Sequence, residues 1–199
     1  MDVRSCTANL STRGTASSVG GCAFNIAYQG DCVSLRQAAS LRQVAKPSMK
    51  NLVLASYNAN LAEELLSLWR QSFEHGVGIT DPHPLQEQRA FFLGQVLPKN
   101  SVRIALEAGS LVGFIAATPE SVSQLYVRVS CLGHGVGSLL LHWAKEQSNG
   151  SLWLYTFAQN TNARRFYEKH GFEAVAYGFE PTWKLEDVKY EWLRSRVAT

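Results

Sequence analysis

Hydrophobic positions follow two different periods between residues 51 and 194, and this pattern predicts a mixture of strands and helices. The segment Ala108-Gly109-Ser110 separates two apolar runs within 101–120, as the turn of a hairpin would. The run at 151–158 is apolar on both faces, which is typical of a central strand. Runs of apolar and β-branched residues predict strands at 51–57, twice within 101–120, and at 121–129, 151–158, 172–179 and 188–194.

Apolar residues spaced three and four apart predict four helices in the same part of the chain. Asn60 is expected to cap the first, near 60–73, with Glu63 completing a capping box. Pro84 suits the first turn of a second helix, and Gly171 suits the C-terminal end of the last. The remaining helices are predicted at 84–96, 135–147 and 161–170. The resulting order, β-α-α-β-β-β-α-β-α-β-β, predicts a mixed α/β (α+β) domain.

The first 48 residues differ from the rest of the chain. They are rich in Ser, Ala, Gly and Thr and show no sustained period, so we expect a mostly disordered extension at 1–48 and a folded domain at 49–199. Scattered arginines and few acidic residues fit an organelle transit peptide. The alternatives are an extension without function, or translation that starts at Met49.

Charge and cysteine content narrow the function classes. Of the 19 basic and 16 acidic side chains, five and two lie in residues 1–48, so residues 49–199 carry 14 of each sign. A neutral domain argues against strong nucleic-acid binding. The four cysteines lack CxxC spacing, which argues against a disulfide framework or zinc site and favours a reducing, cytoplasmic compartment. No apolar run approaches the roughly 20 residues of a membrane span, so we expect no membrane partner.

The stretch Cys131–Leu141 (CLGHGVGSLLL) places Gly133, Gly135 and Gly137 between a predicted strand and a predicted helix. It lacks the P-loop pattern, and Ser138 replaces the last glycine of a dinucleotide fingerprint. Glycines at a helix N-terminus still let backbone N–H groups approach a phosphate. On these residues alone, a phosphate cradle and a simple strand–turn–helix junction are equally supported.

A second motif lies downstream of this loop. Asn160 begins an Asn-x-x-Ala-x-x-Phe-Tyr element that runs through Tyr167 and closes with His170-Gly171-Phe172. Together with Leu125-Tyr126-Val127 and the glycine loop, this order resembles the GCN5-related N-acetyltransferase (GNAT) family over about residues 50–195. The resemblance implies a mostly antiparallel central sheet flanked by helices, acetyl-CoA as cosubstrate and a primary amine as acceptor. Leu132 stands where the family has Gln or Arg, which removes one polar contact.

The resemblance also implies roles for individual residues. In the family, the strand before the loop splays from its neighbour, and its backbone binds the pantetheine arm. Carried over, Asn160 would bind the pantetheine region, and Tyr167 would donate a proton to the leaving thiolate. The N–H of Val127 would stabilise the oxyanion. The expected cofactor-binding residues are Leu125, Tyr126, Val127, Gly133, His134, Gly135, Val136, Gly137, Ser138, Asn160 and Tyr167.

The general base is not evident from the sequence. Some family members use a glutamate five residues before the Asn, where this chain has Tyr155. Glu120 is the first choice for a catalytic base. His75 and His83 lack a third ligand at metal-like spacing, so no metal is expected. The other candidates for the base are Glu74, His75, Asp81, His83 and Gln124.

The leading hypothesis is therefore an acetyl-CoA-dependent N-acetyltransferase. A non-catalytic CoA or metabolite sensor on the same fold is the alternative, and an interaction module without CoA is a third reading. The segment 73–88 is expected to form a wall of the acceptor site. The sequence does not distinguish among a polyamine, an aminoglycoside, an amino acid and a protein N-terminus as the acceptor. The last strand could join a partner's sheet in a homodimer.

Overall fold

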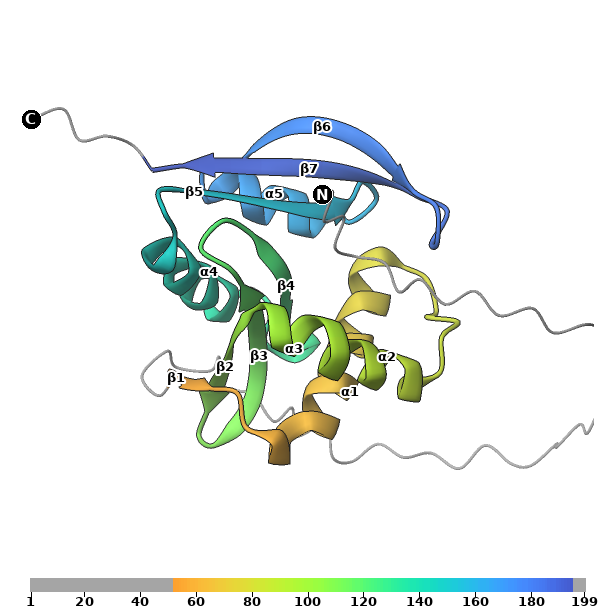
Figure 1. Cartoon of the computed structure of the whole chain (residues 1–199), viewed down its shortest axis with the longest axis vertical. Coiled ribbons are helices and arrows are strands. Elements are labelled where there is room, and N and C mark those ends of the chain that lie inside the picture. The colour runs from red at the N-terminus through yellow and green to blue at the C-terminus, as the bar shows by residue number, and fades with distance from the viewer. Residues whose placement is uncertain (1–51, 195–199) are drawn as a thin grey trace, which may run out of the picture. The chain divides into compact units, whose positions relative to one another are not determined.

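The computed structural model describes residues 52–194, and Figure 1 shows how its helices and strands are arranged. The strands and the main helices follow one another in the predicted order. The expectations for residues 1–48 fall outside the described residues. The last strand begins three residues earlier than predicted, at Leu185.

Strands within residues 52–127 form a four-stranded antiparallel sheet in the order β1-β2-β3-β4. The turn between β2 and β3 places Ala108 and Gly109 at φ of 49° and 82°, as tight hairpin turns require. Strand β3 is buried along almost its whole length because helices cover both faces of this sheet. The strands are β1 (Leu52–Ser56), β2 (Ser101–Glu107), β3 (Ser110–Ala117) and β4 (Val122–Val127).

Strands within residues 151–193 form a separate three-stranded antiparallel sheet in the order β5-β7-β6. Its strands are β5 (Ser151–Phe157), β6 (Glu173–Glu180) and β7 (Leu185–Leu193). A parallel bridge between Ser121 and Trp153 joins the two sheets at the start of β4. Beyond this bridge β4 and β5 are not paired, so two neighbouring strands diverge in the middle of the domain.

Helices pack on both sides of the diverging strands. On one side, α1 (Ala62–Val77) and α2 (Leu85–Phe91) enclose a core that includes Leu65, Trp69 and Phe114. On the other side, α4 (Val136–Gln147) and α5 (Thr161–Lys169) enclose a core that includes Leu140, Tyr167 and Tyr190. The gap between β4 and β5 is therefore flanked by α1 and α2 on one side and by α4 and α5 on the other.

Two helix boundaries differ from the sequence prediction. Asn58, not Asn60, caps the start of the first helical segment, because its side chain accepts a hydrogen bond from the Asn60 N–H at 3.0 Å. A 3-10 turn at Ala59–Leu61 then leads into α1. The second predicted helix continues past 96 through a π turn at Phe92–Val96 into α3 (Leu97–Lys99).

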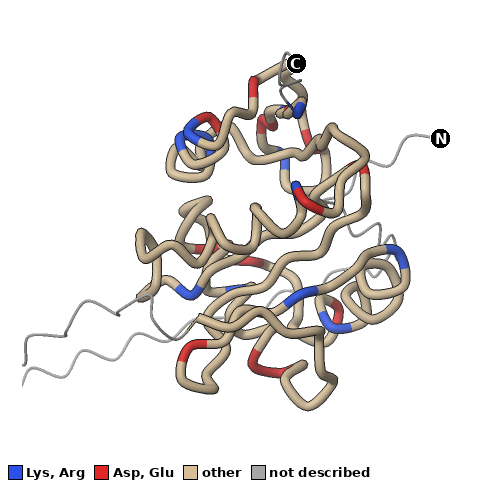
Figure 2. Tube along the Cα trace, turned by 90° about the vertical axis from the view of Figure 1, so that its left-hand side faces the viewer, with Lys and Arg blue, Asp and Glu red and all other residues tan. Residues whose placement is uncertain are grey.

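Charged residues of both signs are interspersed along the chain. Figure 2 shows Lys and Arg positions scattered among Asp and Glu positions along the trace. Within residues 52–194, no helix is long and apolar enough to cross a membrane. The same residues contain no group of three His, Cys, Asp or Glu side chains that could hold a metal ion.

Candidate active site

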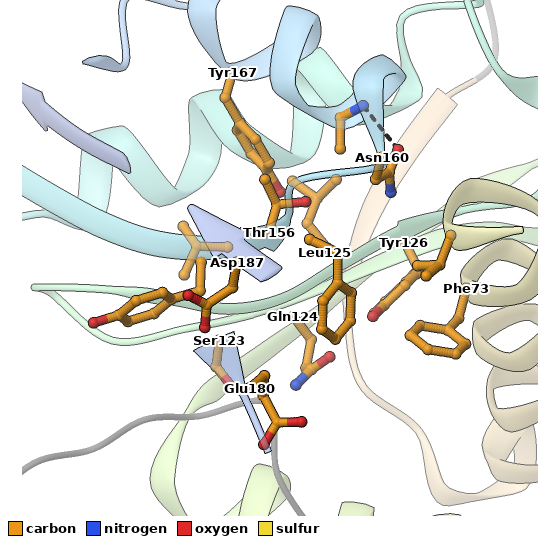
Figure 3. Close-up of a pocket in the computed structure, with 15 residues that line it drawn as sticks. Phe73, Ser123, Gln124, Leu125, Tyr126, Thr156, Asn160, Tyr167, Glu180 and Asp187 are labelled. Carbon is orange, nitrogen blue, oxygen red and sulfur yellow. Dashed lines mark hydrogen bonds between the residues drawn. The ribbon is translucent and has the colours of Figure 1, made fainter. Parts of the chain in front are cut away.

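A cleft opens where β4 and β5 diverge, and side chains from both sheets and from α1 and α5 line it (Figure 3). Gln124 and Leu125 enter the cleft from β4, and Thr156 enters from β5. The full lining consists of Phe73, Val77, Val122, Ser123, Gln124, Leu125, Tyr126, Tyr155, Thr156, Phe157, Asn160, Ala163, Tyr167, Glu180 and Asp187.

A bulge in β4 shapes this cleft. Ala116 of β3 pairs with Gln124, whereas Ala117 pairs with Val122, so Ser123 is an extra residue on β4. After the bulge, the Arg128 N–H donates to the Val112 carbonyl of β3 at 2.8 Å. Because successive N–H groups of a strand point to opposite sides, those of Leu125 and Val127 point away from β3 and across the cleft.

The glycine loop turns the chain from β4 into α4. Gly133 and Gly135 have φ of 78° and 85°, which residues with a Cβ rarely adopt. Gly137 has a different role, since a Cβ there would lie 3.2 Å from the Phe166 ring of α5. Among the described residues, no side chain caps α4, so the N–H groups of its first turn remain available to an anion.

The loop is fixed to α5 through His170. Its Nε2 lies 3.0 Å from Ser138 Oγ, and its Nδ1 lies 2.7 Å from the Phe166 carbonyl. The Ser138 hydroxyl is thus hydrogen-bonded to His170. The backbone N–H of Ser138, in the first turn of α4, is the group that could bind a ligand. His134 in the loop is half-buried, and Leu132 is 44% exposed rather than packed under the loop.

Asn160 combines a structural contact with a position in the cleft. Its Oδ1 accepts a hydrogen bond from the Ala163 N–H at 3.1 Å and so caps α5. Its Nδ2 lies against α1 at Gly76, where a Cβ would come within 2.7 Å. The side chain therefore bridges α5 and α1 beside the cleft.

Tyr167 extends from α5 into the cleft and is only 7% exposed. Figure 3 shows its ring pointing toward Thr156 on β5. The neighbouring Tyr190 hydroxyl is used elsewhere, since it donates to Glu168 at 2.7 Å and accepts from Arg164 at 3.2 Å. Burial raises the pKa of the Tyr190 phenol, which keeps this hydroxyl protonated at neutral pH.

Comparison with known proteins agrees with this geometry. Residues 98–174, which hold the bulged strand, the glycine loop and the Asn-to-Tyr element, match the family model of the acetyltransferase (GNAT) domain. This match and the similar proteins below support the resemblance to the GCN5-related N-acetyltransferase family that the sequence predicted. The mostly antiparallel GNAT fold expected from the sequence is confirmed, with the sheet split between β4 and β5.

Similar GNAT proteins include a curated relative and solved structures. The peptidyl-lysine N-acetyltransferase YjaB of Salmonella typhimurium is 26% identical over 114 residues, which are 57% of this chain and 77% of YjaB. The solution structure of apo YjaB from Escherichia coli has a TM-score of 0.60 at 20% identity and covers 72% of this chain and 99% of its own. The PaiA N-acetyltransferase of Thermoplasma acidophilum, solved with coenzyme A, has a TM-score of 0.58 at 17% identity over 72% and 99% of the two chains.

Glu120, the first choice for a base, does not reach the GNAT cleft. It is exposed in the turn before β4, where its N–H donates to Thr118 Oγ1 at 3.2 Å and its carbonyl accepts from the Trp153 N–H at 3.0 Å. This is the end at which β4 and β5 are still joined, so Glu120 lies outside the cleft lining. Of the other candidates, Gln124 lines the cleft, whereas Glu74 and His75 do not.

Two carboxylates in the cleft were missed by the sequence analysis. Glu180 at the end of β6 is 6% exposed, and its two oxygens accept hydrogen bonds from the N–H groups of Thr182 and Trp183 at 3.1 and 2.7 Å. Asp187 lies on β7 beside Gly178, where a Cβ would be 2.5 Å from Asp187 Oδ1. Both reach the cleft because β7 inserts between β5 and β6, a strand order that the linear sequence does not reveal.

An aromatic hollow adjoins the cleft on the α1 and α2 side. Phe73, Gln124, Tyr126 and Phe157 line both spaces, so the two lie side by side. The segment 73–88 supplies part of its wall, including Asp81 and His83. The hollow is lined by Trp69, Phe73, Asp81, His83, Glu87, Gln88, Phe91, Gln124, Tyr126, Phe157 and Trp183.

Hydrogen bonds hold the polar side of the hollow in place. His83 Nδ1 lies 3.0 Å from Asp81 Oδ1, and Arg70 donates to the His83 carbonyl at 2.6 Å. The Trp183 ring packs against His83 and Phe73, with centroid separations of 4.9 and 4.7 Å. The loop before α2 and the β6–β7 turn therefore meet over the hollow and form one wall together.

Proposed function

We propose that this chain transfers the acetyl group of acetyl-CoA to a primary amine. The observation that carries the proposal is the divergence of β4 from β5, which opens a cleft lined by Leu125, Asn160 and Tyr167. The glycine loop follows β4 and leads into α4. Backbone groups on a free strand edge pair with an extended ligand as they would with another strand. The pantetheine arm has the polar amide groups that such pairing requires.

The donor would lie on the α4 and α5 side. Leu125, Tyr126 and Val127 would hold the pantetheine arm and the thioester, and Asn160 Nδ2 would bind an arm carbonyl. The pyrophosphate would lie on the loop and the first turn of α4, formed by Gly133, His134, Gly135, Val136, Gly137 and Ser138. The complex of PaiA with coenzyme A shows that a protein of this fold accommodates this cofactor.

The chemistry would be a direct transfer through a tetrahedral intermediate. The Val127 N–H, which points away from β3, would stabilise the developing oxyanion. When the carbon–sulfur bond breaks, the Tyr167 hydroxyl would donate its proton to the departing thiolate. Its burial and its direction toward Thr156 keep the phenol inside the cleft rather than in solvent.

The acceptor would enter through the aromatic hollow. Aromatic faces stabilise a nearby ammonium and an apolar stem, and Glu87 adds a carboxylate to the lining. A primary amine on an aliphatic stem, such as a lysine side chain, fits these walls. The relative YjaB is described as a peptidyl-lysine N-acetyltransferase, which supports the same class.

Two assays test this proposal. Calorimetric titration should detect binding of acetyl-CoA, and a chain that binds none would contradict both the enzyme and the sensor hypotheses. A thiol-release assay with a short lysine peptide, spermidine and an aromatic amine should detect turnover of at least one. Binding of acetyl-CoA without turnover of any amine would favour the non-catalytic sensor instead.

A further inference from the structure

We propose that Asp187 is the general base that deprotonates the acceptor ammonium. This inference rests on the proposed function, because an amine enters the reaction with no free lone pair until it loses a proton. The base must therefore face the acceptor, on the side of the cleft opposite the proton donor. Neither the predicted Glu120 nor Tyr155, at the family's glutamate position, supplies a carboxylate there.

The strand register places Asp187 on the acceptor's side. Asp187 pairs with Phe157 of β5, and paired residues project from the same face of a sheet. Phe157 packs against Phe73 of α1 and Trp183, with centroids 6.0 and 6.5 Å apart, so this face is the one beside the aromatic hollow. The adjacent Val188 projects from the other face, into the core that contains Tyr167.

The two cleft carboxylates have different surroundings. Both Glu180 oxygens accept backbone N–H groups of the β6–β7 turn, so this carboxylate positions Trp183 in the wall of the hollow. Asp187 extends across Gly178 of β6, and any side chain at 178 would collide with its Oδ1. The glycine thus leaves room for the Asp187 carboxylate, which lines the cleft.

The proton and electron pairs can be followed through the step. The acceptor ammonium gives one proton to an Asp187 oxygen, directly or through one water, and its freed lone pair attacks the thioester carbon. The carbonyl electron pair moves onto oxygen, then returns as the carbon–sulfur bond breaks and its pair leaves on sulfur. Tyr167 protonates the sulfur and regains a proton from the amide nitrogen through water, while Asp187 releases its proton to solvent.

Other ionisable groups surround Asp187, and a pH profile reports on them together. Lys189 lies two residues along the same face of β7 and pairs with Glu191 at 2.6 Å. The remaining titratable groups that share the cleft are Tyr155 on β5, Glu180 at the end of β6, Tyr126 on β4 and Tyr167 on α5.

The test compares Asp187→Asn with Glu191→Gln in the full chain. Glu191 is on the same face of β7 but outside the cleft, so its variant should retain wild-type turnover. With a lysine peptide at about pH 7.5, Asp187→Asn should lower kcat about 10²-fold or more. Its calorimetric affinity for acetyl-CoA should stay within about twofold of wild type, since hydrogen-bond losses to the cofactor would cost more than that.

Two further readouts separate a base from a structural residue. The activity of Asp187→Asn should rise with pH toward the intrinsic pKa of a lysine amine, about 10.4, whereas wild type levels off earlier. Hydroxylamine is already neutral at about pH 8, so with this acceptor Asp187→Asn should approach wild-type rates. A Gly178→Ala variant, which displaces the carboxylate without removing it, should show the same selective loss with the lysine peptide.

The outcomes distinguish this inference from the proposed function. If wild type turns over no amine, the transferase proposal fails and the role of Asp187 fails with it. If wild type is active and Asp187→Asn matches it at every pH, Asp187 is not the base although the enzyme proposal stands. If Asp187→Asn loses activity equally with hydroxylamine and the lysine peptide, the residue supports the structure of the cleft and not proton transfer.

Discussion

At the scale of single residues, the two groups proposed to transfer protons come from different elements. Tyr167 reaches the cleft from α5, whereas Asp187 approaches it from β7 on the acceptor's face. Leu132 lies at the loop, with its side chain 44% exposed beside the proposed pyrophosphate site. Each of these side chains can be substituted without altering the backbone groups that line the cleft.

Substitution Tyr167→Phe should slow turnover far more than it weakens cofactor binding. The ring keeps its packing against Phe166, Phe172 and Tyr190, and only the hydroxyl is lost. Removal of a general acid typically costs 10²- to 10⁴-fold, so kcat should fall by about 10²-fold or more. Stopped assays of thiol release together with calorimetry measure both quantities, and unchanged turnover would contradict the role as proton donor.

Substitution Leu132→Gln should tighten coenzyme A binding. A new hydrogen bond of about 0.5–1.5 kcal/mol corresponds to roughly a two- to tenfold lower Kd by calorimetry. Leu132→Ala is the control, and it should leave the Kd near that of wild type because this side chain is not buried under the loop. Weaker binding by the Gln variant would show that Leu132 packs against the loop when the cofactor is bound.

At the scale of elements, the sequence predicted the strands and helices themselves better than the order in which the strands lie in the sheets. Apolar periodicity identified the strands and the main helices in order, because both depend on local spacing. The Asn60 cap was wrong, since Asn58 offers the side-chain oxygen two residues earlier. Glu180 and Asp187 could not be placed from the sequence, because only the β5-β7-β6 strand order brings them beside β4.

The cap of α5 and the proposed contact with the cofactor can be separated at Asn160. Substitution Asn160→Asp keeps the oxygen that accepts the Ala163 N–H, so stability to urea should stay close to wild type. It removes the Nδ2 donor, so coenzyme A binding should weaken.

Asn160→Ala is the matched comparison. It removes the cap as well and should lower the free energy of unfolding by about 1 kcal/mol. If Asn160→Asp binds coenzyme A as tightly as wild type, Asn160 is a cap alone.

The packing of α4 against α5 depends on the absence of a side chain at Gly137. Substitution Gly137→Ala would place a Cβ 3.2 Å from the Phe166 ring. Overpacking of this kind costs about 1–3 kcal/mol, which urea denaturation measures. Gly94→Ala is the control, because a Cβ at that position meets no described atom within 4 Å, and it should not destabilise the protein.

At the scale of the whole domain, the described residues form two sheets that share one cleft. The parallel bridge between Ser121 and Trp153 closes one end, and the bulge at Ser123 directs the rest of β4 away from β5. Helices α4 and α5 cover the side proposed for the donor, and α1 and α2 cover the side proposed for the acceptor.

The Asn-to-Tyr element could be recognised in the sequence because it is a contiguous motif, and Asn160, Ala163 and Tyr167 line the cleft. The glycine loop is also contiguous, and the structure places it between β4 and α4, as predicted. Glu120 was chosen by its closeness to β4 in the sequence, but the strand starts at the closed end of the cleft, so the turn before it faces solvent. Closeness to β4 in the sequence thus did not predict a position in the cleft, because the direction of the strand decides which of its ends borders the cleft.

The central claim is that coenzyme A lies along the free edge of β4 and on the loop before α4. Amide chemical shifts, followed by two-dimensional NMR during a titration with coenzyme A, test this directly. The account predicts the largest changes at Leu125, Val127 and the amides of 133–138, with smaller ones at the start of α5. Changes confined to other parts of the domain, or no changes at all, would contradict it.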